Sequence, residues 1–292
     1  MLTLGILCSG RLGLSTLKHI VKNNKVKFVL TDKKSINIIT FSKENNIPIF
    51  AGNPRQSRGF NFIKTIKVDI IVSINYLFLI EEDIIEHPKK FAFNIHGSLL
   101  PKYRGRAPHI WAIINGEKRT GITAHIIDAN CDTGDIINQF PVEIEPESTG
   151  ADILKKYTEL YIPLVDKVLL AIENNDLKII PQDNSKATFF GKRTPDDGEI
   201  NWNWNKENIR NWVRAQAYPY PGAFTFLDNK KVIIDKVSTE KNNRFSAENG
   251  EIIKLKPRIT VKVKDGLVIL EKIRSKNYNF NIGNRFTNED RK

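Results

Sequence analysis

The sequence predicts an α/β protein with a Rossmann-like, mostly parallel sheet and helices on both faces, followed by a small, mainly-β C-terminal domain of OB-like type. In the first part, short apolar runs alternate with longer amphipathic segments. Those runs are continuous and do not alternate polar with apolar residues, as is typical of strands buried on both faces of a parallel sheet. In the last third, short strand-like runs are separated by Asp-Asn, Asn-Gly and Asp-Gly turns, which predict a small barrel or open sheet.

The elements of the first domain follow in order. Leu2–Cys8 predicts a buried strand, and Ser9–Gly13 a turn into an amphipathic helix with apolar residues at Leu14, Leu17, Ile20 and Val21. Further strands are expected at Val26–Leu30, Pro48–Phe50, Val68–Ser73 and Phe91–Ile95, with helices near Ser35–Asn45 and Arg58–Lys67. Parallel sheets bind ligands beyond the carboxyl ends of their strands, so the end of Phe91–Ile95 is a candidate position for a site.

The second half begins with a long periodic segment, Thr149–Ile172, which predicts a helix capped by Ser148 or Thr149. We expect this helix to close a catalytic domain of residues 1–180, with a linker at 181–200. A β-rich domain is expected at 201–275, and a loose tail with little apolar content at 276–292. Within the β-rich domain a helix is expected at Lys206–Ala215, before strands at Ala223–Leu227, Lys231–Val237, Glu251–Leu255, Thr260–Val263 and Leu267–Glu271.

The chain is basic, with 45 Lys and Arg against 33 Asp and Glu and a net charge of +12. This balance invites a nucleic-acid-binding interpretation. The basic residues are spread along the chain and are not concentrated on one expected element, which weakens that interpretation. A positive surface also suits anionic small molecules.

No apolar run is long enough to span a membrane and no leader-like segment precedes the first strand, so we expect a cytoplasmic protein without a membrane partner. The only cysteines, Cys8 and Cys131, cannot form a disulfide framework. No Cys/His cluster has zinc-ligand spacing, and we expect no metal.

Three residues carry the candidate chemistry: Asn94, His96 and Asp132. Asn94 and His96 lie two positions apart at a strand end and therefore point to the same face. Acyl transfer to an amine needs an amide donor for the developing oxyanion, a base for the released proton and a carboxylate that holds the base. Asn94, His96 and Asp132 fit these roles in that order. Taken alone, Asn-x-His is more often a pair of polar residues ending a strand, and Asp-x-Gly is more often a turn cap.

Two further features leave alternatives open. The turn Gly10–Gly13 resembles a phosphate-binding loop in part, but a dinucleotide fingerprint needs three glycines. Because Asp32 follows the second strand, an NAD-binding module stays open, although we prefer a tight turn whose amides and Arg11 approach an acceptor. His87 and His125 have no evident partner, and we expect both to be structural.

The run FNIHGSLLPKYRGRAP, Phe93–Pro108, is similar to the 10-formyltetrahydrofolate-dependent formyltransferases. Gly116-Glu117, Thr120–Thr123 and Asp132–Asp135 extend the resemblance in order. That family includes enzymes that formylate glycinamide ribonucleotide, methionyl-tRNA and nucleotide-linked amino sugars. Gly191–Trp202 and Arg214–Phe224 most resemble the formyltransferase domain of the bacterial polymyxin-resistance enzyme, which acts on UDP-4-amino-4-deoxy-arabinose.

The resemblance implies a formyl donor and a set of site residues. It assigns catalysis to Asn94, His96 and Asp132, with 10-formyltetrahydrofolate as donor, and it implies a cis bond at Leu100-Pro101. The implied folate contacts are Phe78, Leu79, Ile80, Arg106, Asp128, Ala129, Asn130, Cys131 and Asp132. The expected acceptor contacts are Gly10, Arg11, Tyr103, Lys192 and Arg193.

The acceptor is expected to be a nucleotide-linked amino sugar. Methionyl-tRNA formyltransferases carry a basic insertion after the second strand, whereas Val29–Ser35 leads directly into the next helix here. Glycinamide ribonucleotide enzymes normally stop after the first domain, and this chain continues. A methionyl-tRNA formyltransferase is the alternative within the family, and a nucleic-acid-binding protein that reuses the fold is the alternative from another class. A homodimer through the C-terminal domain is left open.

Overall fold

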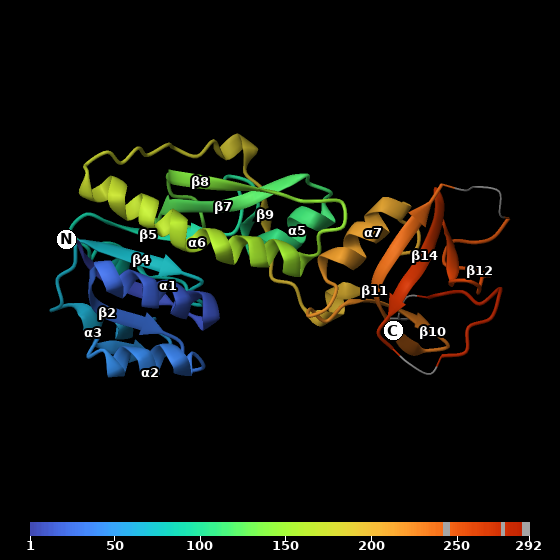
Figure 1. Ribbon diagram of the computed structural model, residues 1–292, viewed down its shortest axis with the longest axis horizontal. Coiled ribbons are helices and arrows are strands. Elements are labelled where there is room, and N and C mark those ends of the chain that lie inside the picture. Colours follow the sequence, from blue (N-terminus) through green and yellow to red (C-terminus); the bar gives the residue numbers. More distant parts are fainter. Residues whose placement is uncertain (242–245, 276–277, 288–292) are drawn as a thin grey trace. The chain divides into compact units, whose positions relative to one another are not determined.

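The computed structural model describes residues 1–241, 246–275 and 278–287 (Figure 1). The chain divides into two compact units. The N-terminal unit contains residues 1–105, 121–142 and 156–189, and the C-terminal unit contains 106–120, 143–155 and 190–292. These groups differ from the contiguous ranges 1–180 and 201–275 expected from the sequence. The reason is that α5 (Pro108–Ile114) packs against α7 (Lys206–Ala215).

The N-terminal unit is built on a seven-stranded sheet with the order β3-β2-β1-β4-β5-β7-β8. The five strands from β3 to β5 are parallel, and β7 pairs with β5 in the antiparallel sense, so the expected mostly parallel sheet is confirmed. The strands are β1 (Thr3–Cys8), β2 (Lys25–Thr31), β3 (Ile49–Ala51), β4 (Ile70–Ile74), β5 (Phe91–His96), β7 (Arg119–Ile126) and β8 (Ile136–Glu143).

Helices cover both faces of this sheet. One face carries Leu7 and Ala92, which form a core cluster with Ile63 of α3 (Arg58–Ile63) and Ile84 of α4 (Glu82–Ile85). Gly5 lies on the same face, where a Cβ would stand 2.2 Å from the ring of Phe28, so only glycine lets that ring pack against β1. On the opposite face α1 lies so close that a Cβ on its Gly13 would be 2.9 Å from the Cys8 Cβ.

The remaining helices are α1 (Gly10–Asn23), α2 (Ile36–Glu44) and α6 (Gly150–Glu173), with short 3₁₀ turns at Asn184–Lys186 and Pro195–Gly198. The expected cap of α6 is confirmed, because the Asp152 amide donates to Thr149 Oγ1 and the Thr149 amide donates to the Asp152 carboxylate. A two-stranded ribbon joins β6 (Arg104–Gly105) to β9 (Phe189–Phe190). In the described part of the chain no helix is long and apolar enough to cross a membrane.

The C-terminal unit contains a five-stranded antiparallel sheet with the order β10-β11-β14-β13-β12. The expected small β domain is thereby confirmed, and α7 packs on its core through Ile209 and Val213. The strands are β10 (Ala223–Leu227), β11 (Lys230–Glu240), β12 (Ile252–Lys254), β13 (Thr260–Val263) and β14 (Gly266–Ile273).

The expectation of a loose tail is wrong for residues 278–287. Thr287 pairs with Phe226 of the edge strand β10, and Arg285 pairs with Glu251 beside the other edge strand, β12. Phe286 is 3% exposed and stacks on Trp202 with ring centroids 5.3 Å apart. The buried Phe286, the partly buried Tyr278 and Phe280 and main-chain pairing to both sheet edges therefore outweigh the polar composition of this segment. Residues 276–277 and 288–292 lie outside the described residues.

Candidate active site

The site begins at the end of β5, where the antiparallel partner β7 adds a histidine. The register places His125 opposite Asn94 and Thr123 opposite His96. Asn94 Nδ2 lies 3.2 Å from His125 Nε2. His96 and His125 are both buried, at 7% and 2% exposure. Strand pairing therefore brings into the site a histidine that sequence reasoning took to be structural.

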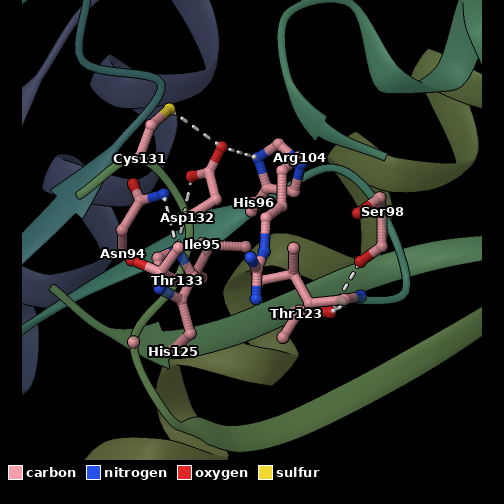
Figure 2. Close-up of polar contacts among 12 residues, drawn as sticks. Asn94, Ile95, His96, Ser98, Arg104, Thr123, His125, Cys131, Asp132 and Thr133 are labelled. Atoms are coloured by element: carbon pink, nitrogen blue, oxygen red, sulfur yellow. Dashed lines mark hydrogen bonds and ion pairs between the residues drawn. The ribbon is translucent and has the colours of Figure 1, made fainter. Parts of the chain in front are cut away.

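Asp132 reaches the same place from the loop between β7 and β8. Figure 2 shows its carboxylate between the two imidazoles, with Oδ2 3.5 Å from His96 Nδ1 and Oδ1 3.6 Å from His125 Nε2. The Gly105 amide donates to Oδ2 at 2.9 Å, and the Cys131 thiol donates to the same oxygen at 3.4 Å. The three residues predicted to form the catalytic group, Asn94, His96 and Asp132, thus lie together.

The tautomer of His96 is set by a backbone carbonyl. His96 Nε2 lies 2.8 Å from the oxygen of Tyr103, and a carbonyl can only accept, so Nε2 carries the proton of the neutral ring. The lone pair then sits on Nδ1, which faces Asp132. The Tyr103 carbonyl thus fixes the tautomer of the neutral ring, and an ionised Asp132 in this position can stabilise a proton on Nδ1.

His125 and Asn94 orient each other by the same logic. His125 Nδ1 donates to the Ile126 carbonyl at 2.7 Å, which leaves Nε2 as an acceptor. Asn94 Nδ2 donates one proton to that acceptor. This contact identifies the nitrogen end of the Asn94 amide. Because the amide group is planar, the hydrogen bond to His125 also fixes the direction of the second Nδ2 proton.

At neutral pH the surroundings favour a neutral His96 and an ionised Asp132. Burial lowers the pKa of the His96 imidazole, against the opposing effects of the Asp132 charge and the Tyr103 carbonyl. Burial alone would raise the pKa of Asp132, but the neighbouring imidazoles of His96 and His125 and the Gly105 amide together hold it far below its usual range. The site therefore combines a neutral imidazole with an ionised carboxylate, ready to take up one proton.

The residues expected to contact folate fall into two groups. Phe78, Leu79 and Ile80 follow β4, whose last residues pair with the end of β5, so this loop borders the site. Ile80 packs on the core, whereas the side chains of Leu79 and nearby Leu77 are 57% and 50% exposed. Leu77 is a further apolar surface residue of this loop that sequence reasoning passed over.

The second group forms the loop before Asp132. Ala129, Asn130 and Cys131 are exposed, and the loop is closed at its base by Asp128, which accepts from Thr133 Oγ1 at 2.7 Å. Arg106 is exposed as well, and its amide donates to the Phe190 carbonyl. Its folate role stays a prediction.

Of the expected acceptor residues, three belong to the N-terminal unit. Gly10 and Arg11 are exposed at the start of α1, and Gly10 adopts a left-handed φ of 66° while its amide donates to Ser35 Oγ. Tyr103 is buried, at 7% exposure, and its backbone holds His96.

The other two, Lys192 and Arg193, lie in the C-terminal unit. Lys192 is exposed, whereas the Arg193 guanidinium lies between two indoles, 4.9 Å from Trp111 and 4.5 Å from Trp212. It also donates to Gln216 Oε1 at 3.1 Å. This packing orders the Arg193 side chain, and the acceptor roles of Lys192 and Arg193 stay predictions. Among the described residues, no group of His, Cys, Asp or Glu side chains could hold a metal ion.

Two protein-family models match this chain. Residues 11–164, more than half of the chain, match the formyl transferase family, and residues 192–289 match the formyl transferase C-terminal domain. The chain belongs to the formyl transferase family.

Particular relatives are similar over most of the chain. It is 37% identical over 277 residues to the bifunctional polymyxin resistance protein ArnA of Wigglesworthia glossinidia brevipalpis, a match that covers 91% of this chain and 40% of that protein. This chain therefore spans about two fifths of that relative's length.

Among solved structures, the sugar 3N-formyl transferase WlaRD, solved with dTDP and 5-N-formyl-THF, matches with a TM-score of 0.73 at 24% identity over 95% of this chain and 99% of that one. The N-formyltransferase from Helicobacter canadensis, solved with folinic acid and dTDP-3-aminofucose, matches with a TM-score of 0.73 at 23% identity over 94% and 100% of the two chains. At these identities the likeness shows a shared fold.

Proposed function

We propose that this protein transfers a formyl group from 10-formyltetrahydrofolate to the amine of a nucleotide-linked amino sugar. The observation that carries the proposal is the grouping of Asn94 and Asp132 around the buried His96, with a bare imidazole nitrogen facing an ionised carboxylate. This is the arrangement that acylation of an amine requires. It occurs in a chain of the formyl transferase family whose similar proteins include sugar N-formyltransferases.

His96 handles the proton in this reaction. When the acceptor nitrogen bonds to the formyl carbon, that nitrogen must lose a proton, and Nδ1 of His96 is the basic atom that the Tyr103 contact leaves bare. The imidazolium formed is stabilised by Asp132, 3.5 Å away and only 12% exposed. The same proton is then available for the folate nitrogen that is released, so protons and bonds balance over the turnover.

Asn94 stabilises the negative charge that develops on the formyl oxygen. One of its amide protons is donated to His125, which holds the amide plane, and the other is the donor for the oxyanion. A donor of this kind contributes roughly 3 kcal/mol to the transition state. His125 acts through Asn94 and is a positioning residue in this scheme.

Folate would supply the formyl group, and the loops beside the site suit it. Leu77 and Leu79 offer exposed apolar surface of the kind that the ring faces of a ligand cover. The second loop is Ala129–Cys131, whose residues are exposed and whose base is fixed by Asp128. Main-chain groups there can pair with a pterin, which needs both donors and acceptors.

The acceptor would enter past the start of α1. The carboxyl ends of β1, β4 and β5 lie along one sheet edge, so Gly10 and Arg11 follow the same edge as His96. Arg11 is an exposed cation at a helix start, which suits a diphosphate. We propose Gly10, Arg11 and Tyr103, all in the N-terminal unit, as the acceptor side of the site. A cytoplasmic location and a homodimer through the C-terminal unit accord with this function and stay proposals.

The test is a formylation panel followed by mass. The protein is incubated with 10-formyltetrahydrofolate and UDP-, dTDP- or GDP-linked amino sugars, beside charged initiator tRNA. We expect one nucleotide sugar to gain the mass of a single formyl group, and the His96→Asn protein to produce none. A gain on the tRNA alone would overturn the sugar assignment while keeping the formyl transfer chemistry.

A further inference from the structure

We propose that Gln182 is a positioning residue of the active site: it holds the backbone of the Asp132 loop and, through Arg104, the segment whose carbonyl fixes the tautomer of His96. The inference rests on the proposed function for its kinetic consequences. The arrangement itself is independent of the acceptor. Gln182 lies 50 residues after Asp132 in a stretch that the sequence presents only as a linker.

The amide nitrogen of Gln182 is used entirely on the Asp132 loop. Nε2 donates to the Asp132 carbonyl at 2.9 Å and to the Gly134 carbonyl at 2.7 Å. Asp132 has a left-handed φ of 58°, which costs an L-residue on the order of 1–3 kcal/mol and persists only where the surroundings impose it. A Cβ on Gly134 would stand 2.0 Å from the Ile126 carbonyl, so this turn is also tight against β7. The two hydrogen bonds from Gln182 clamp the turn from its other side.

The amide oxygen of Gln182 faces the opposite way, toward Arg104. It accepts from Arg104 Nη2 at 2.8 Å and from Nε at 3.3 Å, and the same guanidinium donates to Asn184 Oδ1 at 2.8 Å. Arg104 is only 8% exposed, so its donors must be satisfied within the protein. Gln182 therefore fixes Arg104 as firmly as it fixes the Asp132 loop.

Arg104 follows Tyr103, whose carbonyl holds His96. Tyr103 has a left-handed φ of 61°, and its amide donates to Thr188 Oγ1 at 2.8 Å, while the Arg104 amide donates to the Thr188 carbonyl at 2.9 Å. The segment that supplies Gln182 is itself anchored, because Ile180 exchanges two main-chain hydrogen bonds with Ile136 of β8.

The two nitrogens of the His96 ring thus contact two different loops. Nδ1 meets the Asp132 carboxylate and Nε2 meets the Tyr103 carbonyl. Two connections join those loops. The Gly105 amide donates directly to the Asp132 carboxylate, and the Gln182 side chain bridges the Asp132 carbonyl and the Arg104 guanidinium. Without the bridge, one hydrogen bond has to keep the carboxylate in line with the imidazole, and misplacement by about 1 Å can cost on the order of 10²-fold in rate.

The chain offers its own reporter of the Asp132 loop. Cys131 is exposed and its thiol donates to Asp132 Oδ2, whereas Cys8 is buried and burial raises its pKa to about 12. A thiol reagent such as DTNB therefore reacts at Cys131 in the native protein. Release of the loop separates the thiol from the carboxylate, favours the thiolate and speeds the reaction.

The test compares Gln182→Ala with a matched control, Gln216→Ala. Gln216 makes the same kind of contacts in the C-terminal unit: Oε1 accepts from Arg193 and Nε2 donates to the Trp212 carbonyl at 3.0 Å. We expect Gln182→Ala to raise the DTNB rate at Cys131 severalfold while Gln216→Ala leaves it at the parent value. If Gln182→Ala does not fold, Gln182→Met, which keeps the volume and removes the hydrogen bonds, gives the same comparison.

With a nucleotide sugar that is formylated, Gln182→Ala should lower kcat about 10-fold or more with the KM of the sugar unchanged. The acid limb of kcat/KM should move to lower pH, because a displaced Asp132 supports the protonated imidazole less. A parent-like acid limb together with a parent-like DTNB rate would overturn the proposal, whatever the change in stability. Because the DTNB arm needs no substrate, its result stands even if no sugar in the panel is formylated.

Discussion

Replacing Asp132 by Asn removes the charge that supports a proton on His96 and leaves the size of the side chain unchanged. The carboxylate lies 3.5 Å from Nδ1, and the two side chains are 12% and 7% exposed. At an effective dielectric of about 20, the Coulomb attraction between imidazolium and carboxylate is about 5 kcal/mol, an upper value because the buried imidazolium also loses hydration. The Asn amide can in addition donate to Nδ1 and so block the basic atom.

Both effects act on the proton transfer step, so we expect Asp132→Asn to lower kcat about 10²- to 10⁴-fold. The acid limb of kcat/KM should move to lower pH, because the Asp132 charge raises the pKa of His96 and the amide does not. Folinic acid should still bind. The assay is the formylation rate from pH 5 to 9, with binding followed by calorimetry.

The matched control is Asp166→Asn. Asp166 also contacts a histidine of the N-terminal unit, His19 at 2.9 Å, but is 52% exposed. Exposed pairs contribute little, so its kcat and its pH profile should equal those of the parent. Our reasoning is refuted if Asp132→Asn retains activity within about fivefold of the parent or if its acid limb does not move.

Three further outcomes follow from the packing. Leu79→Ser should weaken folinic acid binding about fivefold by removing roughly 1 kcal/mol of apolar contact, whereas Leu170→Ser, at a leucine of equal exposure (58% against 57%), should leave calorimetric affinity unchanged. Burial lowers the pKa of His109 from 6.5 to about 4, so the unfolded chain binds the proton more readily and stability falls as pH drops from about 6.5 to 4. Urea unfolding should show up to about 3 kcal/mol of that loss in the parent and not in His109→Gln. Phe286→Ala should cost about 3–5 kcal/mol in the same assay and Ile282→Ala, at 67% exposure, close to nothing; equal losses would argue against the docked C-terminal segment.

Much of the fold follows from local pattern. Continuous apolar runs such as Ile70–Ile74 predict buried parallel strands, and β10 and β13 have the bounds expected from turn residues. The segment 278–287 could not be predicted in this way. Its docking depends on a few aromatics, chiefly the buried Phe286, and on main-chain pairing to sheet edges, and main-chain hydrogen bonds leave no trace in composition.

In the site, too, local sequence pattern predicts some residues and misses others. The proximity of Asn94 and His96 follows from the two-residue period of a strand. His125 was missed because its role comes from antiparallel pairing with β5, and neither the partner nor the register of β7 can be read from one segment. Gln182 carries no motif, and only the folded chain shows that its amide bridges two loops. The contacts of Arg193 with Trp111 and Trp212 likewise could not be predicted from its charge, and its acceptor role stays a prediction.

The chemistry proposed for the site depends on a neutral His96 whose proton is on Nε2, and imidazole ¹⁵N NMR measures this directly. The five histidines of the chain can be resolved in protein with ¹⁵N-labelled imidazoles, with His96 assigned by its loss in His96→Asn. At pH 7 we predict a His96 signal pair with Nε2 protonated and Nδ1 bare, and protonation at Nδ1 only on acidification. A ring that carries its proton on Nδ1 at pH 7, or one that is already cationic there, would contradict the role of His96 as the base that accepts the proton of the amine.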